Sequence, residues 1–185
     1  MTCIVGMETG GTVVLGGDAW TSTEWSGAPL AQPKVWRAGE FVYGCAGSLR
    51  AGQVFRHLYD APPLPYAPNA LDIDRYMVGP WIHALQVAMR EARVATDEQE
   101  TPSGTEFLVG VRGCLYVVEA DYATWRCARG YHAIGTGSEL ALGALHALRA
   151  GCSGFTPRVL VQLAIASACE HANTVRGPIT IVEVP

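Results

Sequence analysis

The sequence predicts an α+β fold, a four-layer αββα sandwich in which two stacked β-sheets are covered by helices on both outer faces. Runs of β-branched and aromatic residues come in groups, at residues 3–47 and 105–135, and one more closes the chain at 177–184. Amphipathic stretches with helical spacing separate these groups as two pairs, within 48–95 and 138–173. Grouped strands and grouped helices favour α+β over an alternating α/β fold, although periodicity alone also allows two layers.

Two hairpins are expected in the first group of strands. The runs "TCIVGM" and "TVVLGGD" are separated by Glu8, Thr9, Gly10 and Gly11, a combination typical of a tight turn. Residues 31–47 predict a second hairpin with its turn at "AGE". The "CAG" that ends it contains a glycine where the backbone bends sharply or approaches another segment closely.

The first pair of helices surrounds a proline-rich segment. Ser48 is a typical N-cap residue for a helix that follows it directly. The segment 62–68 interrupts the helical pattern and is too short for an interdomain linker. A long amphipathic helix is expected over 71–95, and Gly79-Pro80 predicts either its start or a kink.

The second group of strands and the second pair of helices have clear boundaries. Four short strands are expected over 105–135. A helix over 138–151 would end at Gly151. The last helix would be capped by Thr156, with Pro157 at its first position.

Composition and charge restrict the class of protein. The 185 residues predict one domain over 1–185, with 49% hydrophobic and only 16% charged residues. This apolar balance indicates that part of the surface is buried against other subunits. The formal net charge of −4 argues against nucleic acid as a partner. No apolar run reaches the roughly 18 residues that span a membrane, so no membrane partner is expected.

The six cysteines have no spacing typical of a metal site, and the five histidines form no ligand pattern. We therefore expect no metal and no cofactor. Reduced cysteines are usual in the cytoplasm, which is the predicted location.

Thr2 raises the question of chemistry at the N-terminus. An N-terminal threonine supplies a nucleophile and a base in one residue, because its free α-amine can take the proton of its hydroxyl. The ordinary pKa of an α-amine, about 7.7–8.0, already suits this task near neutral pH. For Thr2 this role requires removal of Met1.

Such a site also needs a cation, a carboxylate to hold it and an oxyanion hole. Asp18 ends the second strand of the first hairpin, which brings it back beside Thr2. Lys34 opens the next hairpin, and Gly47 offers an unhindered N–H just before a helix. From these residues alone, Asp18 and Lys34 could also form a structural ion pair, and Gly47 could simply ease a turn.

The order of these motifs resembles the β-type subunits of the proteasome family, closest to HslV-type peptidases and small bacterial proteasome homologues. The matching features are Thr2, "GGD" with Asp18, "KV" with Lys34 and "CAG" with Gly47. Further on, "HAIGTGSELALGAL" resembles the family's "IGSG" segment leading into a helix. The resemblance extends from Thr2 to about Val184.

This resemblance implies the N-terminal-nucleophile hydrolase fold and a role for each matched residue. Thr2 would be the nucleophile after Met1 is removed, Asp18 and Lys34 the adjacent charge pair, and Gly47 the oxyanion donor.

Other matched positions carry supporting roles. Thr136 stands where the family usually has a serine near the N-terminal amine. Ser22 matches a position that holds substrate through its backbone, and Ala46 matches a position in the substrate pocket. The sequence departs from proteasome β subunits after the last helix, where "CEHANTVRGP" has Thr174 but no aspartate. HslV-type enzymes also lack that aspartate.

The resemblance implies a threonine-type endopeptidase subunit of a self-compartmentalised ring. Its substrates would be peptides or unfolded proteins, and its partners further copies in stacked hexameric or heptameric rings. An ATP-dependent unfoldase is also compatible with the family. The alternatives are a catalytically inactive proteasome-like ring scaffold and, from another branch with this chemistry, an amidase acting on small molecules.

Overall fold

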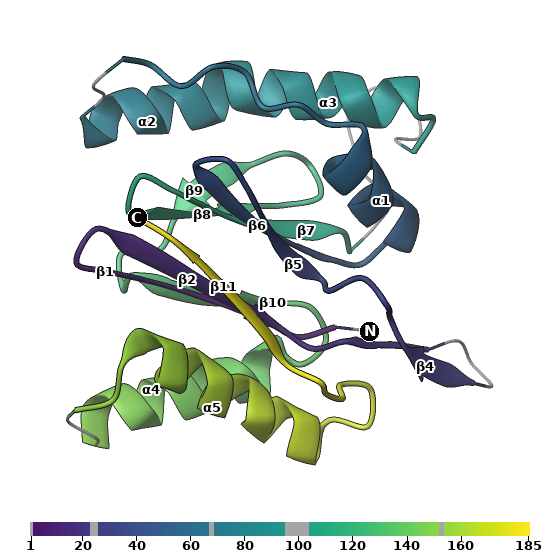
Figure 1. Cartoon of the computed structure of the whole chain (residues 1–185), viewed down its shortest axis with the longest axis vertical. Coiled ribbons are helices and arrows are strands. Elements are labelled where there is room, and N and C mark those ends of the chain that lie inside the picture. Colours follow the sequence, from purple (N-terminus) through teal and green to yellow (C-terminus); the bar gives the residue numbers. More distant parts are fainter. Residues whose placement is uncertain (1, 23–25, 67–68, 95–103, 152–153) are drawn as a thin grey trace.

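Two antiparallel β-sheets lie face to face in a computed structural model of the chain, and helices cover both outer faces (Figure 1). The structure describes residues 2–22, 26–66, 69–94, 104–151 and 154–185. The predicted α+β class and the four-layer αββα arrangement are confirmed.

The first sheet has the strand order β10-β1-β2-β11. Its strands are β1 (Ile4–Thr9), β2 (Thr12–Gly17), β10 (Tyr131–Ile134) and β11 (Thr180–Val184). Thr9 pairs with Thr12, so the predicted first hairpin has a two-residue loop. That loop consists of Gly10 and Gly11, whose φ angles of 53° and 82° suit glycine.

The second sheet has the order β5-β6-β7-β8-β9. Its strands are β5 (Val35–Ala38), β6 (Phe41–Ala46), β7 (Glu106–Val111), β8 (Cys114–Val118) and β9 (Thr124–Arg126). The four strands expected over 105–135 therefore divide between the sheets, because the chain crosses over after β9 and β10 joins β1.

A short pair of strands, β3 (Trp20–Ser22) and β4 (Gly27–Pro29), extends away from the sandwich beside the N-terminus (Figure 1). This pair was not expected from the sequence, since three-residue strands give too short a pattern to recognise. The indole of Trp20 covers Gly27, where a Cβ atom would lie only 2.5 Å from Trp20 Nε1.

The second sheet is covered by α1 (Leu49–His57), α2 (Ala70–Tyr76) and α3 (Ile82–Glu91) (Figure 1). Ser48 caps α1 as predicted, accepting a hydrogen bond from the Ala51 amide at 3.2 Å. The helix predicted over 71–95 begins at Ala70, after an Asn69 cap, and ends at Glu91.

Gly79-Pro80 does not start this helix. Both residues lie in a π-helical segment, Met77–Trp81, that joins α2 to α3. A π-helical turn shifts the backbone hydrogen bonds by one residue, which accommodates a proline that has no N–H to donate.

The first sheet is covered by α4 (Ser138–Gly151) and α5 (Pro157–His171). Thr156 caps α5 as expected, accepting from the Val159 amide, and Pro157 occupies the first turn. Both predicted helices are therefore present, and α5 ends two residues earlier than expected.

Buried apolar side chains fill the spaces between the sheets and between each sheet and its helices. Aromatic residues such as Tyr43, Phe55 and Trp81 fill the space between the second sheet and its helices. Aliphatic residues fill the space between the two sheets, where Val13 contacts the backbone of Gly110. Because no side chain separates the strands at Gly110, the two sheets approach closely there.

The close approach at Gly110 can be tested with a matched pair of glycine substitutions. A Cβ atom at Gly110 would lie 2.5 Å from Val13 Cγ1, so we expect Gly110→Ala to destabilise the fold by about 1–3 kcal/mol. At Gly143, on α4, a Cβ atom has no neighbour within 4 Å, and Gly143→Ala should stabilise the helix by roughly 0.5–1 kcal/mol. Urea unfolding of both variants measures the difference; equal stabilities would contradict this account of the sheet interface.

Candidate active site

Thr2 lies two residues before the start of β1, and its neighbour Cys3 is held against the end of β2. The register that pairs Ile4 with Gly17 places Cys3 opposite Asp18. The Asp18 amide donates to the Cys3 carbonyl at 3.2 Å, and the Cys3 amide donates to Asp18 Oδ1 at 2.8 Å. The predicted return of Asp18 to the neighbourhood of Thr2 is therefore a direct result of the two-residue hairpin.

Asp18 is a buried carboxylate with strong partners. Its exposed fraction is 1%, and the Trp20 amide donates to its second oxygen at 3.0 Å. The ammonium group of Lys34 lies 3.0 Å from both carboxylate oxygens. A buried charge is tolerated when it is paired and hydrogen-bonded in this way.

Lys34 connects this carboxylate to the hydroxyl of Thr2. Its Nζ atom donates to Thr2 Oγ1 at 3.1 Å and also to the Trp20 carbonyl. Burial lowers the pKa of Lys34, and the charge of Asp18 opposes this shift. A cation 3.1 Å from a hydroxyl oxygen lowers that oxygen's affinity for its proton, which favours a nucleophilic oxygen.

The backbone nitrogen of Thr2 faces a different group. It donates to Thr136 Oγ1 at 3.3 Å, and Thr136 Oγ1 lies 3.2 Å from Thr174 Oγ1. The turn after β10 wraps closely around Thr2: the Gly137 amide donates to the Thr2 carbonyl at 3.1 Å. Gly135 has a φ of 86°, and a Cβ atom there would lie 2.4 Å from the Thr2 carbonyl oxygen, so this turn requires glycine.

Cys3, the neighbour of Thr2, is a poor nucleophile in this setting. It is fully buried, and burial raises the pKa of its thiol to about 12. The thiol therefore stays protonated at neutral pH.

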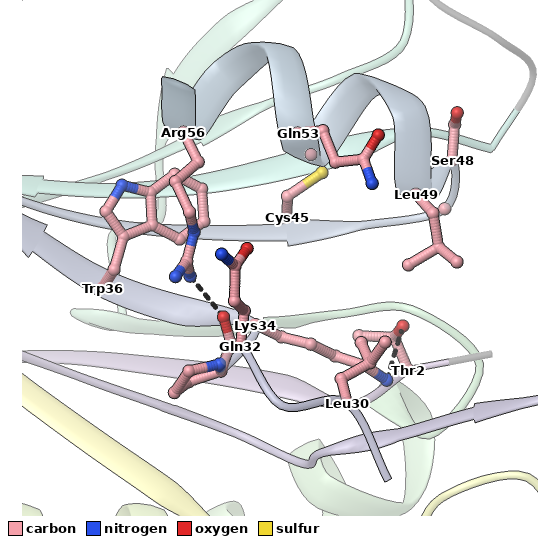
Figure 2. A pocket seen from close by; sticks show the side chains of 13 residues that line it. Thr2, Leu30, Gln32, Lys34, Trp36, Cys45, Ser48, Leu49, Gln53 and Arg56 are labelled. Carbon is pink, nitrogen blue, oxygen red and sulfur yellow. Dashed lines mark hydrogen bonds between the residues drawn. The ribbon is translucent and has the colours of Figure 1, made fainter. Parts of the chain in front are cut away.

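Thr2 and Lys34 line one end of a cavity of about 110 Å³ (Figure 2). The other lining residues come mainly from the start of β5, the end of β6 and α1: Leu30, Gln32, Pro33, Trp36, Cys45, Gly47, Ser48, Leu49, Gly52, Gln53 and Arg56. Gly47 has a φ of 97°, and a Cβ atom there would lie 2.4 Å from the Gly104 carbonyl oxygen. The cavity thus brings the hydroxyl of Thr2 and the backbone of Gly47 to one space.

Both predicted substrate-binding residues, Ser22 and Ala46, lie outside the lining of this cavity. Ser22 ends β3, and its hydroxyl is buried without a hydrogen-bond partner among the residues that the structure describes. The side chain of Ala46 is 1% exposed and packs in the layer between the two sheets. Contact with substrate through the backbone of Ser22, and a place for Ala46 in the substrate pocket, stay predictions.

Several residues of the cavity were not identified from the sequence, among them Trp36, Gln53 and Arg56. Trp36 lies on β5, while Gln53 and Arg56 lie on α1. Their spacing is compatible with an ordinary amphipathic helix on a sheet, so no sequence signal separates them from surface residues.

No group of three or more His, Cys, Asp or Glu side chains suited to a metal ion occurs in the described part of the chain. None of the described helices combines the length and the apolar character needed to cross a membrane.

The sequence matches no family model and no curated protein significantly. The solved structures that are similar in fold include the following three. BPH of Thiobacillus denitrificans, in complex with epoxomicin, has a TM-score of 0.80 at 18% identity, covering 99% of this chain and 98% of that one. Eukaryotic HslV from Trypanosoma brucei has a TM-score of 0.68 at 20% identity, covering 99% of both chains. The Gly-1 mutant of Anbu from Hyphomicrobium sp. strain MC1 has a TM-score of 0.68 at 22% identity, covering 98% of this chain and 80% of that one.

These three structures have the proteasome-type N-terminal-nucleophile hydrolase fold. The chain therefore has the proteasome-type fold that the sequence motifs implied, along almost its whole length.

The buried ion pair predicts a large effect of Asp18→Asn on stability. Loss of the carboxylate charge leaves the Lys34 ammonium buried without its counter-ion, which should cost about 3–5 kcal/mol. Since the charge of Asp18 opposes the lowering of the Lys34 pKa, its removal lowers that pKa further. At pH values between the pKa of Lys34 in the folded state and its pKa in the unfolded state, the unfolded state binds more protons. The variant's free energy of unfolding should therefore rise with pH toward about 10, more steeply than that of the wild type.

Denaturant unfolding from about pH 7 to about pH 10 measures this dependence. Glu40→Gln is the matched control, because it breaks an exposed ion pair with Arg112 and should cost less than about 1 kcal/mol. An Asp18→Asn protein as stable as the Glu40→Gln protein would contradict the large contribution to stability proposed for the buried ion pair.

Proposed function

We propose that this chain is the catalytic subunit of a threonine-type endopeptidase, with Thr2 as its N-terminal nucleophile once Met1 is removed. The observation that carries the proposal is the 3.1 Å contact between Lys34 Nζ and Thr2 Oγ1, with Lys34 held by the buried Asp18. A structural ion pair alone would not need to point its cation at the hydroxyl of a residue that lines a cavity.

In the first step, Thr2 Oγ1 attacks the carbonyl carbon of a peptide bond while the α-amine of Thr2 takes the hydroxyl proton, directly or through water. The carbonyl oxygen becomes an oxyanion, to which the N–H of Gly47 is proposed to donate. Collapse of this intermediate breaks the C–N bond, and the leaving amine takes the proton from the Thr2 ammonium. The product is an ester between Thr2 and the N-terminal part of the substrate.

In the second step, water attacks the ester carbon and the α-amine of Thr2 again accepts the proton. The C–O bond to Thr2 breaks, Oγ1 takes the proton back, and the new carboxyl group leaves. Lys34 supports both steps as a fixed positive charge beside the oxygen that gains and loses negative charge.

Removal of Met1 is essential because Thr2 otherwise has an amide nitrogen, which is no base. Met1 itself lies outside the described residues. In the released form, the nitrogen of Thr2 would keep Thr136 as its neighbour, with Thr174 behind it. These hydroxyls are proposed to orient the amine toward Oγ1.

Self-assembly into stacked rings is part of the proposal. It is supported by the low charge content and by large apolar side chains exposed on or beside the helices. These side chains are Leu49, Leu58, Leu71, Val78, Leu140 and Leu163. Peptides and unfolded proteins are the proposed substrates, and an ATP-dependent unfoldase stays a prediction. The five described cysteines are free thiols, which suits the proposed cytoplasmic location.

Thr2→Ala should abolish peptide cleavage, because it removes the attacking oxygen, while leaving the fold intact. A peptide epoxyketone tests the same residue directly. Epoxomicin is bound by the BPH structure to which this fold is similar, and such reagents react with an N-terminal threonine through its hydroxyl and amine. We expect the wild-type particle to gain the mass of one reagent per chain and the Thr2→Ala particle to gain none.

Intact mass and N-terminal sequencing of the same particles provide the control. Cleaving particles should begin at Thr2, and cleavage by particles that retain Met1 would disprove the mechanism. Assembled particles that begin at Thr2 yet neither cleave nor react would instead indicate an inactive ring scaffold.

Thr136→Val should lower kcat/KM by about tenfold, because it removes one hydrogen bond to the Thr2 nitrogen while keeping the side-chain volume. The loss should appear in kcat and in the rate of epoxyketone labelling rather than in KM. Thr136→Ser keeps the hydroxyl and should restore the rate. If Ser and Val variants were equally slow, Thr136 would be only a packing residue.

A further inference from the structure

The cavity beside Thr2 has a cation at its far end. Figure 2 shows Thr2 and Leu30 at one end of the cavity and Trp36 and Arg56 at the other. Arg56 comes from α1, whose first turn begins just after Gly47. Thus one short helix places the proposed oxyanion donor and a guanidinium group along the same cavity.

Charge in the cavity is not balanced. Of its two cations, Lys34 is neutralised by Asp18, whereas Arg56 has no carboxylate partner among the described residues. None of the lining residues is an aspartate or glutamate. The neutral amide of Gln32 lies near the guanidinium, and that of Gln53 lies further along the cavity (Figure 2).

Arg56 is also held in place. Its guanidinium carbon lies 4.3 Å from the centroid of the Trp36 ring, a cation–π distance, and its Nη2 donates to the Pro33 carbonyl. An arginine has five N–H donors in a rigid plane, so this fixed orientation leaves donors for a second group. Burial lowers the pKa of Arg56, but an arginine side chain remains charged at neutral pH.

We propose that this cavity binds an acidic side chain of the substrate, with Arg56 as the residue that selects it. This inference rests on the proposed peptidase function. Because the cavity adjoins both Thr2 and Gly47, the side chain that enters it belongs to the residue whose carbonyl carbon is attacked. Cleavage therefore follows glutamate or aspartate, and a carboxylate supplies the counter-charge that Arg56 lacks.

Peptide substrates that differ only in this residue test the proposal with the unmodified particle. Glutamate and glutamine have nearly the same shape, so their comparison isolates charge. We expect kcat/KM to be about tenfold higher for the glutamate peptide, and the ratio to fall as salt is added. A glutamine or leucine peptide cleaved as fast as the glutamate peptide would overturn the proposal.

Variants of Arg56 test whether this residue causes the preference for glutamate over glutamine. Arg56→Met keeps the length of the side chain and should remove the preference for glutamate over glutamine. Arg56→Glu should reverse it in favour of a lysine peptide. Arg50→Met, which removes an exposed cation of the same helix outside the cavity, should leave the ratio unchanged. An unchanged ratio in folded Arg56→Met particles would overturn the role of Arg56.

Failure of this inference differs from failure of the peptidase function. If the function fails, no peptide is cleaved and Thr2 is not labelled by an epoxyketone. If only the inference fails, Thr2 is labelled and peptides are cleaved, but without a preference for glutamate. Should the Arg56 variants not fold, the comparison of glutamate and glutamine in the wild type still decides the matter.

Discussion

The ammonium group of Lys34 is the contact on which the rest of the site depends. It lies between the carboxylate of Asp18 and the hydroxyl of Thr2, with very little access to water. An isolated charge in such a place would be too costly to bury, so the pair must be built accurately. Its geometry is set by the β1–β2 register and by the entry of the chain into β5, two features of the scaffold rather than of flexible loops.

The four-layer arrangement explains how distant segments meet at this point. Thr2 and Asp18 flank strands of the first sheet, whereas Lys34 and Gly47 flank strands of the second. The close stacking of the two sheets lets Lys34 meet Thr2 and Asp18. If the sheets were further apart, the cation beside one could not reach the hydroxyl held by the other.

Much of this could be predicted from the sequence, for physical reasons. A glycine-rich two-residue loop fixes a hairpin's register, so Asp18 had to return to Cys3 once the hairpin was recognised. In contrast, β10 could not be assigned to a sheet, because the residue pattern of a strand does not determine which strand it pairs with. The proposed role of Arg56 could not be predicted either. It depends on the contact with Trp36 and on the absence of an aspartate or glutamate from the cavity lining, which are both properties of the folded chain.

The hydroxyl and the nitrogen of Thr2 have different kinds of neighbours. The hydroxyl faces a fixed cation, while the nitrogen faces the hydroxyl of Thr136 and, behind it, that of Thr174. A neutral hydroxyl stabilises a protonated amine less than a carboxylate does. In the proposed mechanism, the amine released by removal of Met1 would therefore have a neutral neighbour, because the segment after α5 has Thr174 but no aspartate.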